Sequence, residues 1–402
     1  MKSIIILGDG MADRPMECLG GKTPLMVANI PNIDALCAQG RTGRLITVPK
    51  DLPPSSDVAN LGVLGYNIYD VYEGRGVLEA ASIGVELQPG EMAMRCNLIY
   101  IENGKIENHS AGHITSEEAR QLVETLNEEL ASETIRFYPG VSYRHLLVIK
   151  GGVKDLNCTP PHDVPGTPFR DVLVRAERKE AQATADLLNA LIFKSQDILS
   201  QHPINQQRIR AGKDPANSIW PWSPGYKPNM QTFQELYGIK RGAVISAVDL
   251  IQGIGIYAGF DVIKVAGATG FHDTNYEGKA KAVVAAIQDV DFVYLHIEAS
   301  DEAGHEGNVE MKIKTLEDLD RRVVKYLVEQ TAAMTEDVAI ALLPDHPTPC
   351  EVRTHVHDAV PFLIYHPGET PDAVTEFNEE SVAYGSYGLL EGNQFIRALL
   401  QI

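Results

Sequence analysis

Three segments of the chain share one pattern, in which a continuous apolar run ends in a turn that carries an acidic side chain. Uninterrupted runs of this length, rich in β-branched residues, are typical of strands buried in a parallel sheet. The runs are Lys2–Leu7, which leads to Asp9, Asp291–Ile297, which leads to Asp301, and Val338–Leu343, which leads to Asp345 and His346.

Between the last two runs, apolar residues recur at helical spacing. In the segment Lys312–Thr331 they are Ile313, Leu316, Leu319, Val323, Val324 and Leu327. Such spacing predicts an amphipathic helix with one face on the core. The order strand, helix, strand predicts an α/β fold with a parallel sheet flanked by helices.

The middle of the chain has a different pattern. Strands are expected at 92–101 and 144–150, and amphipathic helices at 116–131 and 176–200, before a stretch rich in Pro, Gly and Trp at 214–228. Glycine-containing, charged junctions lie at 73–76 and 240–242. We therefore predict two domains, residues 1–73 with 242–402 forming the sheet domain and residues 74–241 forming an inserted α+β domain.

Charge and cysteine usage narrow the possible partners. The chain has 35 Lys and Arg against 54 Asp and Glu, a formal net charge of −19, so nucleic acid and anionic membranes are poor partners. An anionic substrate would need a local nest of cations. The apolar runs are too short to span a membrane, no signal-peptide pattern opens the chain, and the five cysteines form no CxxC pair. These features predict a cytoplasmic protein.

The acidic strand ends indicate a metal site. The carboxyl ends of parallel strands meet at one edge of a sheet, so Asp9, Asp301 and the Asp345-His346 pair are expected to converge there. Two histidines extend the set, His305 four residues after Asp301 and His355 shortly after His346. Each residue alone is more often a helix cap or a hydrogen-bonded side chain. Together, carboxylates and imidazoles without thiolates suit Mn²⁺, Zn²⁺ or Mg²⁺.

A serine pair follows two prolines at Pro53-Pro54-Ser55-Ser56. One interpretation makes Ser55 or Ser56 the N-cap of a helix that begins near Asp57. The other uses the same geometry for chemistry, because a helix N-terminus favours phosphate, and a serine beside a metal ion can act as a nucleophile. Spacing alone does not decide between the two.

Together these motifs resemble the alkaline phosphatase superfamily, and within it the cofactor-independent phosphoglycerate mutases of the archaeal type. The similarity extends over essentially the whole chain. It includes Ser-Ser-Asp-Val-Ala-Asn (55–60), Ser-Ala-Gly-His (110–113), Asp-Thr-Asn-Tyr-Glu-Gly-Lys (273–279) and Asp-Glu-Ala-Gly-His (301–305). The resemblance implies an alkaline-phosphatase-like sheet and two divalent ions, Mn²⁺ or a similar metal. It implies that Asp301, His305 and His355 bind one ion, and that Asp9, Ser56, Asp345 and His346 bind the other.

The resemblance also implies the reaction, in which Ser56 accepts a phosphoryl group from 3-phosphoglycerate and returns it as 2-phosphoglycerate. The substrate, a small phosphorylated anion, would be clamped by cationic side chains. The candidates are Arg144 and Arg208 in the insert and Lys279 in the sheet domain, with His113, His162 and His109 as weaker ones. The family commonly has Arg where this chain has His113, and Pro where it has Ser300, which affects the clamp more than the metal set.

Three other functions remain open at this point. The segment Cys-Thr-Pro-Pro-His-Asp (158–163) and the Trp-Pro-Trp segment (220–222) are found in a related subgroup suggested to be ATP-dependent homoserine kinases. A site that admits water would make a phosphatase. A metal-stabilised binding protein without turnover is the alternative outside enzymes, although such a site needs no serine. The sequence leaves the metal and the oligomeric state open.

Overall fold

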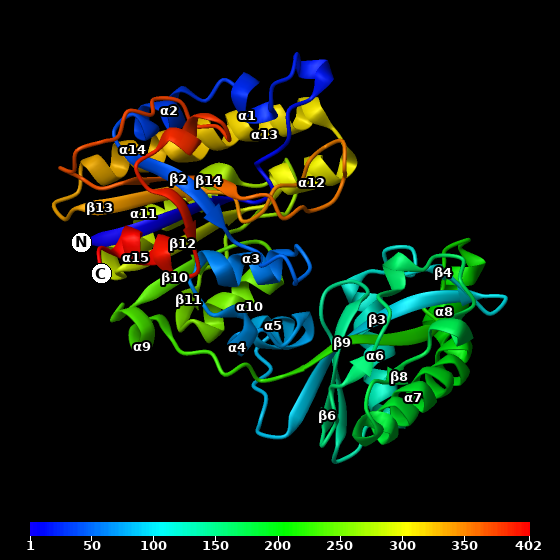
Figure 1. The fold of residues 1–402 in the computed structure, drawn as a ribbon. Coiled ribbons are helices and arrows are strands. Elements are labelled where there is room, and N and C mark those ends of the chain that lie inside the picture. Colours follow the sequence, from blue (N-terminus) through cyan, green and yellow to red (C-terminus); the bar gives the residue numbers. More distant parts are fainter. The chain divides into compact units, whose positions relative to one another are not determined.

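The computed structural model describes residues 1–402, and the chain forms two compact units (Figure 1). Unit 1 consists of Met1–Tyr72 and Asn229–Ile402, and unit 2 consists of Glu73–Pro228. None of the helices combines the length and the apolar character that crossing a lipid bilayer requires.

Unit 1 is built on an eight-stranded mixed sheet with the strand order β11-β10-β12-β1-β13-β14-β2-β15. Five neighbouring strands, from β11 to β13, run parallel, whereas β14 is antiparallel to both β13 and β2. The strands are β1 (Lys2–Gly8), β2 (Arg41–Ile46), β10 (Gly242–Ile245), β11 (Phe260–Val262), β12 (Phe292–Ile297), β13 (Val338–Leu343), β14 (Val360–Tyr365) and β15 (Gly388–Glu391). The predicted α/β class is confirmed, and the three apolar runs are the three central strands.

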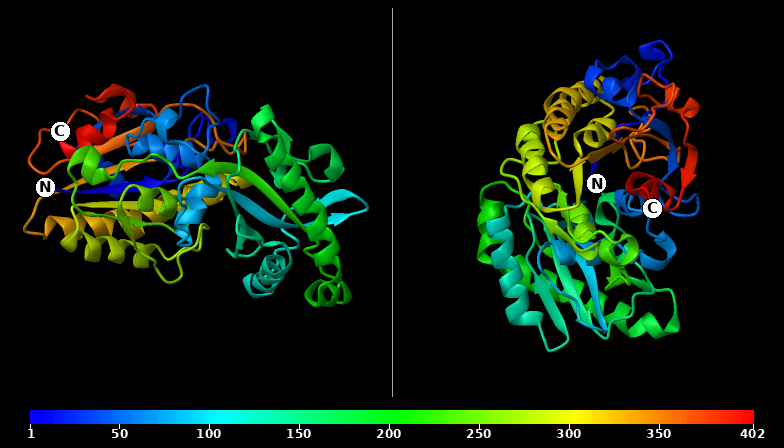
Figure 2. Two further views of the ribbon diagram at one scale, coloured as in Figure 1. Left: turned by 90° about the horizontal axis from the view of Figure 1, so that it is seen from below. Right: turned by 90° about the vertical axis from the view of Figure 1, so that its left-hand side faces the viewer.

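Helices cover both faces of this sheet (Figures 1 and 2). One layer contains α1 (Pro24–Val27), α2 (Pro31–Cys37), α11 (Tyr276–Asp289), α13 (Val309–Leu319) and α14 (Lys325–Ala332). The other face carries α3 (Ser56–Val63), α10 (Asp249–Tyr257) and α15 (Gln394–Leu400), with α4 (Ile68–Val71) and α9 (Phe233–Tyr237) beside them. Coverage on both sides explains why the central strands are apolar throughout.

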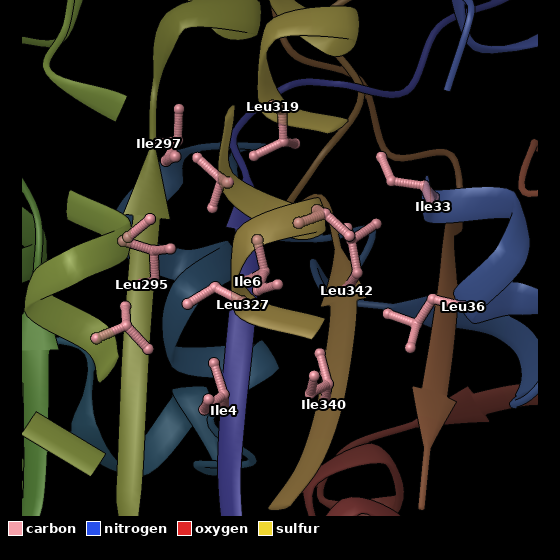
Figure 3. Close-up of a cluster of buried hydrophobic side chains, with 14 of the residues drawn as sticks. Ile4, Ile6, Ile33, Leu36, Leu295, Ile297, Leu319, Leu327, Ile340 and Leu342 are labelled. Carbon is pink, nitrogen blue, oxygen red and sulfur yellow. The ribbon is translucent and has the colours of Figure 1, made fainter. Parts of the chain in front are cut away.

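Alternate residues of the central strands point to opposite helix layers. Figure 3 shows one side of this pattern, where Ile4, Ile6, Leu295, Ile297, Ile340 and Leu342 meet helix residues such as Leu319, Leu327, Ile33 and Leu36. All are buried. The intervening residues of β12, Tyr294 and His296, face the layer that contains α3. This alternation directs Tyr294 towards Asn60 of α3 and His296 towards Asp9.

The predicted helix 312–331 exists but is not regular throughout. It continues from α13 through a π-helical turn, Asp320–Val324, into α14. In this turn Asp320 accepts hydrogen bonds from the backbone N–H of Ile33 (2.7 Å) and from the side chain of Asn32 (2.6 Å). The turn thereby joins the long helix to α2.

Unit 2 has its own sheet, its own helices and its own core. Its antiparallel strands follow the order β4-β3-β6-β5, and β9 pairs with β3. They are β3 (Glu91–Glu102), β4 (Lys105–Asn108), β5 (Ile135–Tyr138), β6 (Arg144–Lys150) and β9 (Ser218–Tyr226); β7 (Leu156–Asn157) and β8 (Arg175–Ala176) form a separate pair. The helices are α5 (Arg75–Ser82), α6 (Ser116–Leu130), α7 (Gln182–Gln201) and α8 (Pro203–Arg210).

The structure differs from the sequence expectations at three places. The second junction lies at Pro228/Asn229 instead of 241/242, because Phe233 packs against Phe260 and Phe292 of unit 1. The stretch around Trp220 and Trp222 contains an edge strand, β9, and edge strands tolerate proline. The helix expected to begin at 176 begins at Gln182, after a 3₁₀ turn.

A buried lysine joins the loops that follow β1 and β13. Lys312 of α13 is fully buried, and its Nζ donates to the Ala12 carbonyl (3.1 Å), the Asp13 carboxylate (2.8 Å) and the Thr348 carbonyl (2.8 Å). Because these loops carry Asp9 and Asp345, Lys312 holds together the two loops that contribute to the candidate site.

Lys312→Met is expected to lower the free energy of unfolding by about 3–5 kcal/mol, because it leaves Asp13 buried without its counter-ion. Urea denaturation measures the effect. Lys314→Met is the matched control, since Lys314 is exposed and pairs with Asp318 at 2.6 Å, and it is expected to cost about 1 kcal/mol or less. Equal losses in the two variants would contradict a special role for the buried pair.

Candidate active site

The carboxyl ends of β1, β12 and β13 bring the predicted ligands together at one edge of the sheet of unit 1. Asp9 follows β1, Asp301 lies in α12 (Ala299–Glu306) just after β12, and Asp345 and His346 follow β13. All four are buried. Two groups of side chains, Asp301 with His346 and His355, and Asp9 with Asp345 and His346, have ligand atoms within 4.8 Å of one another.

Asp301, His305 and His355 also lie close together, and we call these three residues the histidine cluster. His305 Nε2 lies 3.2 Å from Asp301 Oδ2, and His355 Nε2 lies 3.3 Å from Asp301 Oδ1. The two Nε2 atoms are 2.9 Å apart. Asp301 and His305 lie one turn apart on α12, which explains why a spacing of four residues places both at one point.

Hydrogen bonds on the far side of both rings fix their tautomers. His305 Nδ1 lies 3.1 Å from the carbonyl oxygen of Arg353, and His355 Nδ1 lies 2.9 Å from that of Pro54. A carbonyl can only accept, so each Nδ1 carries a proton, and Nε2 is the atom that each ring presents to Asp301. Histidine ligands of metal ions are oriented in this way.

Asp9, Ser56, Asp345 and His346 form the second group, which we call the serine cluster. His346 Nε2 lies 3.1 Å from Ser56 Oγ, 3.5 Å from Asp345 Oδ2 and 3.7 Å from Asp9 Oδ1. The ring of His346 also stacks on that of His355, with ring centroids 3.7 Å apart. The two clusters are therefore contiguous.

The protein alone leaves the charges of this region uncompensated. Asp9 accepts a hydrogen bond from His296 at Oδ2 (2.9 Å), but its buried Oδ1 has no hydrogen-bond partner. Burial, together with the charges of Asp345 and Asp301, raises the pKa of Asp9 well above its ordinary value. An unpartnered carboxylate oxygen among other carboxylates and imidazole lone pairs fits a divalent cation, whose preferred ligands these are.

In the histidine cluster the neighbouring groups act in the opposite direction, because they lower the pKa of the buried carboxylate instead of raising it. Burial would raise the pKa of Asp301, but its hydrogen bonds with His305 and His355 hold that pKa well below the ordinary value. The bond to Asp301 raises the pKa of His305 to about 9. Asp301 is thus a carboxylate that persists in the ionised form, as a metal ligand must.

The structure separates the roles of the two serines. Ser55 occupies the N-cap position of α3 but makes no side-chain capping bond, and Ser56 is the first helical residue. Only the Ser56 hydroxyl contacts His346. The helix N-terminus and the cluster therefore act on one hydroxyl group.

Gly10 allows the loops to approach this closely. Its φ of +61° belongs to the left-handed region, and a Cβ at this position would lie 2.6 Å from both Asp301 Oδ1 and Thr348 Oγ1. Thr348 donates a short hydrogen bond to Asp301 and lies 3.3 Å from His346 Nδ1. A residue with a side chain at position 10 would disturb both clusters.

Sequence reasoning missed several residues of the site. Glu298, at the end of β12, has a carboxylate oxygen within 4.8 Å of those of Asp9 and Asp301, and burial raises its pKa to about 8. The rule that pointed to Asp301 applies equally to Glu298. His296 and Thr348 carried no comparable signal, because their partners lie far away in sequence.

Lys279, a predicted substrate contact, is close to this region. It is buried in α11, and its Nζ donates to the His296 carbonyl oxygen (3.3 Å). Burial lowers the pKa of Lys279 to about 8, although the charge of Glu298 acts in the opposite direction. A single backbone bond leaves two of its three donors for another partner.

Several cationic and aromatic side chains gather within unit 2. The ring of His162 lies 5.4 Å from that of Trp222 and 6.1 Å from that of His109, and His113 lies 6.4 Å from Tyr143. Burial and the charge of His113 lower the pKa of His109. The guanidinium of Arg95 stacks on Trp222 at 4.5 Å, and Arg144, which is exposed, stands over Tyr143 at 5.9 Å. Arg95 and Arg144 supply two cations to this cluster in an acidic protein.

Arg208 has another role from the one predicted. It is 3% exposed, and its guanidinium donates to Glu118 (2.8 Å) and to the carbonyl oxygens of Asp214 (2.9 Å) and Ala111 (2.8 Å). These bonds join α8 to α6 and to two loops. The guanidinium is thereby committed to the fold, so we leave Arg208 out of the substrate contacts.

Comparison with known proteins identifies the family. The model of the family described as 2,3-bisphosphoglycerate-independent phosphoglycerate mutase matches residues 37–205. A curated relative of that name from Methanosarcina acetivorans is 51% identical, with 100% of each chain covered. The chain belongs to this family. A probable mutase from Geobacter sulfurreducens is 45% identical over the full length of both chains.

Solved structures agree with the membership of this mutase family. A protein from Pyrococcus horikoshii gives a TM-score of 0.84 at 31% identity and covers 100% of this chain and 97% of its own. A cofactor-independent phosphoglycerate mutase from Thermoplasma acidophilum gives 0.69 at 28% identity, with 100% and 99% covered. The predicted family is confirmed, and neither a homoserine kinase nor a non-catalytic binding protein is supported by these relatives.

Proposed function

We propose that this chain interconverts 3-phosphoglycerate and 2-phosphoglycerate without 2,3-bisphosphoglycerate, through a phosphoserine at Ser56. The observation that carries the proposal is the Ser56 hydroxyl, 3.1 Å from His346 Nε2 at the junction of the two ligand clusters. The curated relatives, which are named for this reaction, support it. We also propose that the protein acts in the cytoplasm, as its sequence predicts.

In this proposal Asp301, His305 and His355 bind one divalent ion, and Asp9, Ser56, Asp345 and His346 bind a second. The oxygen-rich donor set favours Mn²⁺ among the candidates, with Zn²⁺ and Mg²⁺ as alternatives. When bound, such ions make a coordinated hydroxyl acidic and neutralise the charge of a transferring phosphoryl group. Glu298 lies close enough to Asp9 and Asp301 to shape the same pocket of charge.

The phosphoryl group is then transferred in two steps, each of which forms one bond to phosphorus and breaks another. Ser56 Oγ loses its proton and forms a bond to phosphorus, while the bond from phosphorus to O3 of the substrate breaks and O3 takes up a proton. The glycerate stays bound and presents its 2-hydroxyl, which loses a proton and attacks the phosphoserine; Ser56 leaves and recovers a proton. Because α3 begins at Ser56, the backbone N–H groups of its first turn, which have no partners within the helix, would be available to the oxygens of a phosphoryl group on Ser56.

Holding the glycerate requires a clamp for its carboxylate. Arg144, His113 and His162, with His109 and Arg95, are our candidates, because they gather in the cluster of unit 2 that contains two guanidinium groups. The cluster also contains the aromatic rings of Tyr143 and Trp222. That unit 2 clamps the substrate stays a prediction of the sequence.

A direct assay tests the proposal. Purified protein loaded with Mn²⁺ is incubated with 3-phosphoglycerate in the absence of bisphosphoglycerate, and 2-phosphoglycerate is measured by coupling to enolase. Sustained isomerisation is expected. Release of inorganic phosphate without isomerisation would replace the proposal by a phosphatase.

The pH dependence of kcat/KM is expected to show the titration of the Lys279 side chain. Because burial lowers the pKa of its ammonium to about 8, kcat/KM is expected to fall about tenfold per pH unit above that value, as the positive charge near the phosphoryl group disappears. Lys279→Arg retains its charge at these pH values, so the alkaline fall should be absent from the variant's profile. An identical alkaline fall in both proteins would assign it to another group.

The free energy of unfolding should also change with pH as Lys279 titrates. The folded pKa lies below the ordinary value of 10.5, so the unfolded state binds the proton more readily. The burial of Lys279 therefore destabilises the protein below about pH 8, and this cost disappears as the pH rises towards 10.5.

A further inference from the structure

One turn after Ser56, α3 carries an asparagine whose side chain connects the nucleophile to a candidate metal ligand. Asn60 is fully buried. Its Nδ2 donates to the carbonyl oxygen of Ser56 (2.7 Å) and to Oδ2 of Asp345 (2.8 Å). Both donors of the amide are thus used on the two residues that must meet for the transfer.

A tyrosine fixes the orientation of this amide. The hydroxyl of Tyr294, a buried residue of β12, lies 2.5 Å from Asn60 Oδ1 and donates to it. The reversed amide would direct Oδ1 at the Ser56 carbonyl and the Asp345 carboxylate, which are acceptors only. Only one orientation therefore satisfies all the groups.

The amide of Asn60 is one of three donors to the carboxylate of Asp345. Its Oδ1 accepts from the backbone N–H groups of His346 (2.9 Å) and Gly10 (3.3 Å), and its Oδ2 accepts from Asn60. These donors fix the plane of the carboxylate and offset its charge beside Asp9. The free lone pairs are consequently directed into the serine cluster.

The connection also sets the position of α3. Ser56 and Asp345 are far apart in sequence, and most of the other buried side chains of α3 are apolar and make no directional bonds (Val58, Ala59, Leu61 and Val63). Asn60 ties the Ser56 backbone to the end of β13 by directional bonds. It thereby sets the distance between Ser56 Oγ and the ligands.

We propose that Asn60 is a positioning residue for phosphoryl transfer, which places Ser56 against Asp345, and that Tyr294 orients its amide. The inference rests on the function proposed above, because it assigns to Asn60 the geometry of that reaction. It adds two residues that contact neither substrate nor metal. Its signature is a loss of turnover and of metal affinity that exceeds any loss of stability.

Asn60→Ala is expected to lower kcat about 100-fold, since a displacement of the nucleophile of about 1 Å is enough for that, with KM changed by less than about threefold. The affinity for Mn²⁺, measured by calorimetry on stripped protein, should weaken about 10- to 100-fold. Asn205→Ala is the matched control, because Asn205 is equally buried and makes the same number of bonds, two from Nδ2 and one to Oδ1, within unit 2. It should lower the melting temperature without changing kcat or the Mn²⁺ affinity.

Tyr294→Phe provides a second variant that retains the shape of the core. It should lower kcat about tenfold, because Asn60 Oδ1 loses its donor. Tyr66→Phe, which removes a buried hydroxyl bonded to the Gln231 carbonyl oxygen (2.8 Å), should leave kcat unchanged. If Asn60→Ala and Tyr294→Phe change only the melting temperature, as their controls do, the positioning role is wrong. If the wild type shows no isomerisation, the proposed function fails, and the Mn²⁺ affinities still decide the role of Asn60.

Discussion

Ser56→Ala is expected to lower turnover of 3-phosphoglycerate by at least about 10⁴-fold, as removal of a covalent nucleophile does in other enzymes. The variant loses the only oxygen that can carry the phosphoryl group between the two hydroxyls of glycerate. No other serine or threonine hydroxyl contacts His346 Nε2 in this structure, so no substitute is available. The coupled assay measures the loss, and mass spectrometry of enzyme quenched with substrate should show one added phosphoryl group in the wild type and none in the variant.

The adjacent serine is the natural control. Ser55 precedes α3 and makes no side-chain capping bond, and its hydroxyl donates to the carbonyl oxygen of Pro53 at 3.5 Å. Ser55→Ala should therefore retain kcat within about threefold, since removal of one long hydrogen bond outside the serine cluster changes little. Equal losses in both variants would show that the turn before α3, and not the hydroxyl of Ser56, is what activity needs.

Removal of divalent metal is expected to abolish turnover completely and reversibly. Without an ion, Asp9 Oδ1 stays buried without a hydrogen-bond partner, and the Nε2 atoms of His305 and His355 lie only 2.9 Å apart. Dialysis against a chelator followed by addition of Mn²⁺, Zn²⁺ or Mg²⁺ in separate samples identifies the metal that restores activity. Addition of ion at 100 times its dissociation constant should also stabilise the protein by about 2.7 kcal/mol.

The stabilisation by metal should depend on pH with a definite sign. Because burial and neighbouring charges raise the pKa of Asp9 above its ordinary value, the stripped protein gains stability on acidification, as this carboxyl takes up a proton. An ion competes with that proton, so the difference in melting temperature between loaded and stripped protein should grow as the pH rises from 5 to 7.5. A difference that does not change over this range would contradict the assignment of Asp9 as a ligand.

The sequence predicted the chemistry of the site better than its detailed geometry. Asp9, Asp301, Asp345 and His346 could be found because parallel strands end at one edge of a sheet, so local pattern implies distant proximity. His305 followed from the period of the helix. His355 was a candidate from its place shortly after His346, and only the choice of Ser56 over Ser55 needed the resemblance to a family.

Other expectations depended on contacts that no local pattern reveals. Arg208 has the positive charge that a contact to an anionic substrate needs, yet in the structure it joins α8 to α6 through Glu118. The sequence prediction placed 229–241 in the inserted domain, yet Phe233 makes this segment part of unit 1. In both cases the identity of the partner decides the role, and the partner is distant in sequence.

The sequence by itself determined the α/β class, the three strand ends that carry acidic side chains and the net negative charge, because each follows from short-range periodicity or from composition. Only the tertiary structure decided which hydroxyl meets His346, how Asn60 and Tyr294 connect Ser56 to Asp345, and that Glu298 and Lys279 lie beside the site. The physical reason is that these contacts join side chains from separate strands and helices. Their geometry depends on how the layers pack, which the local preferences of the chain do not encode.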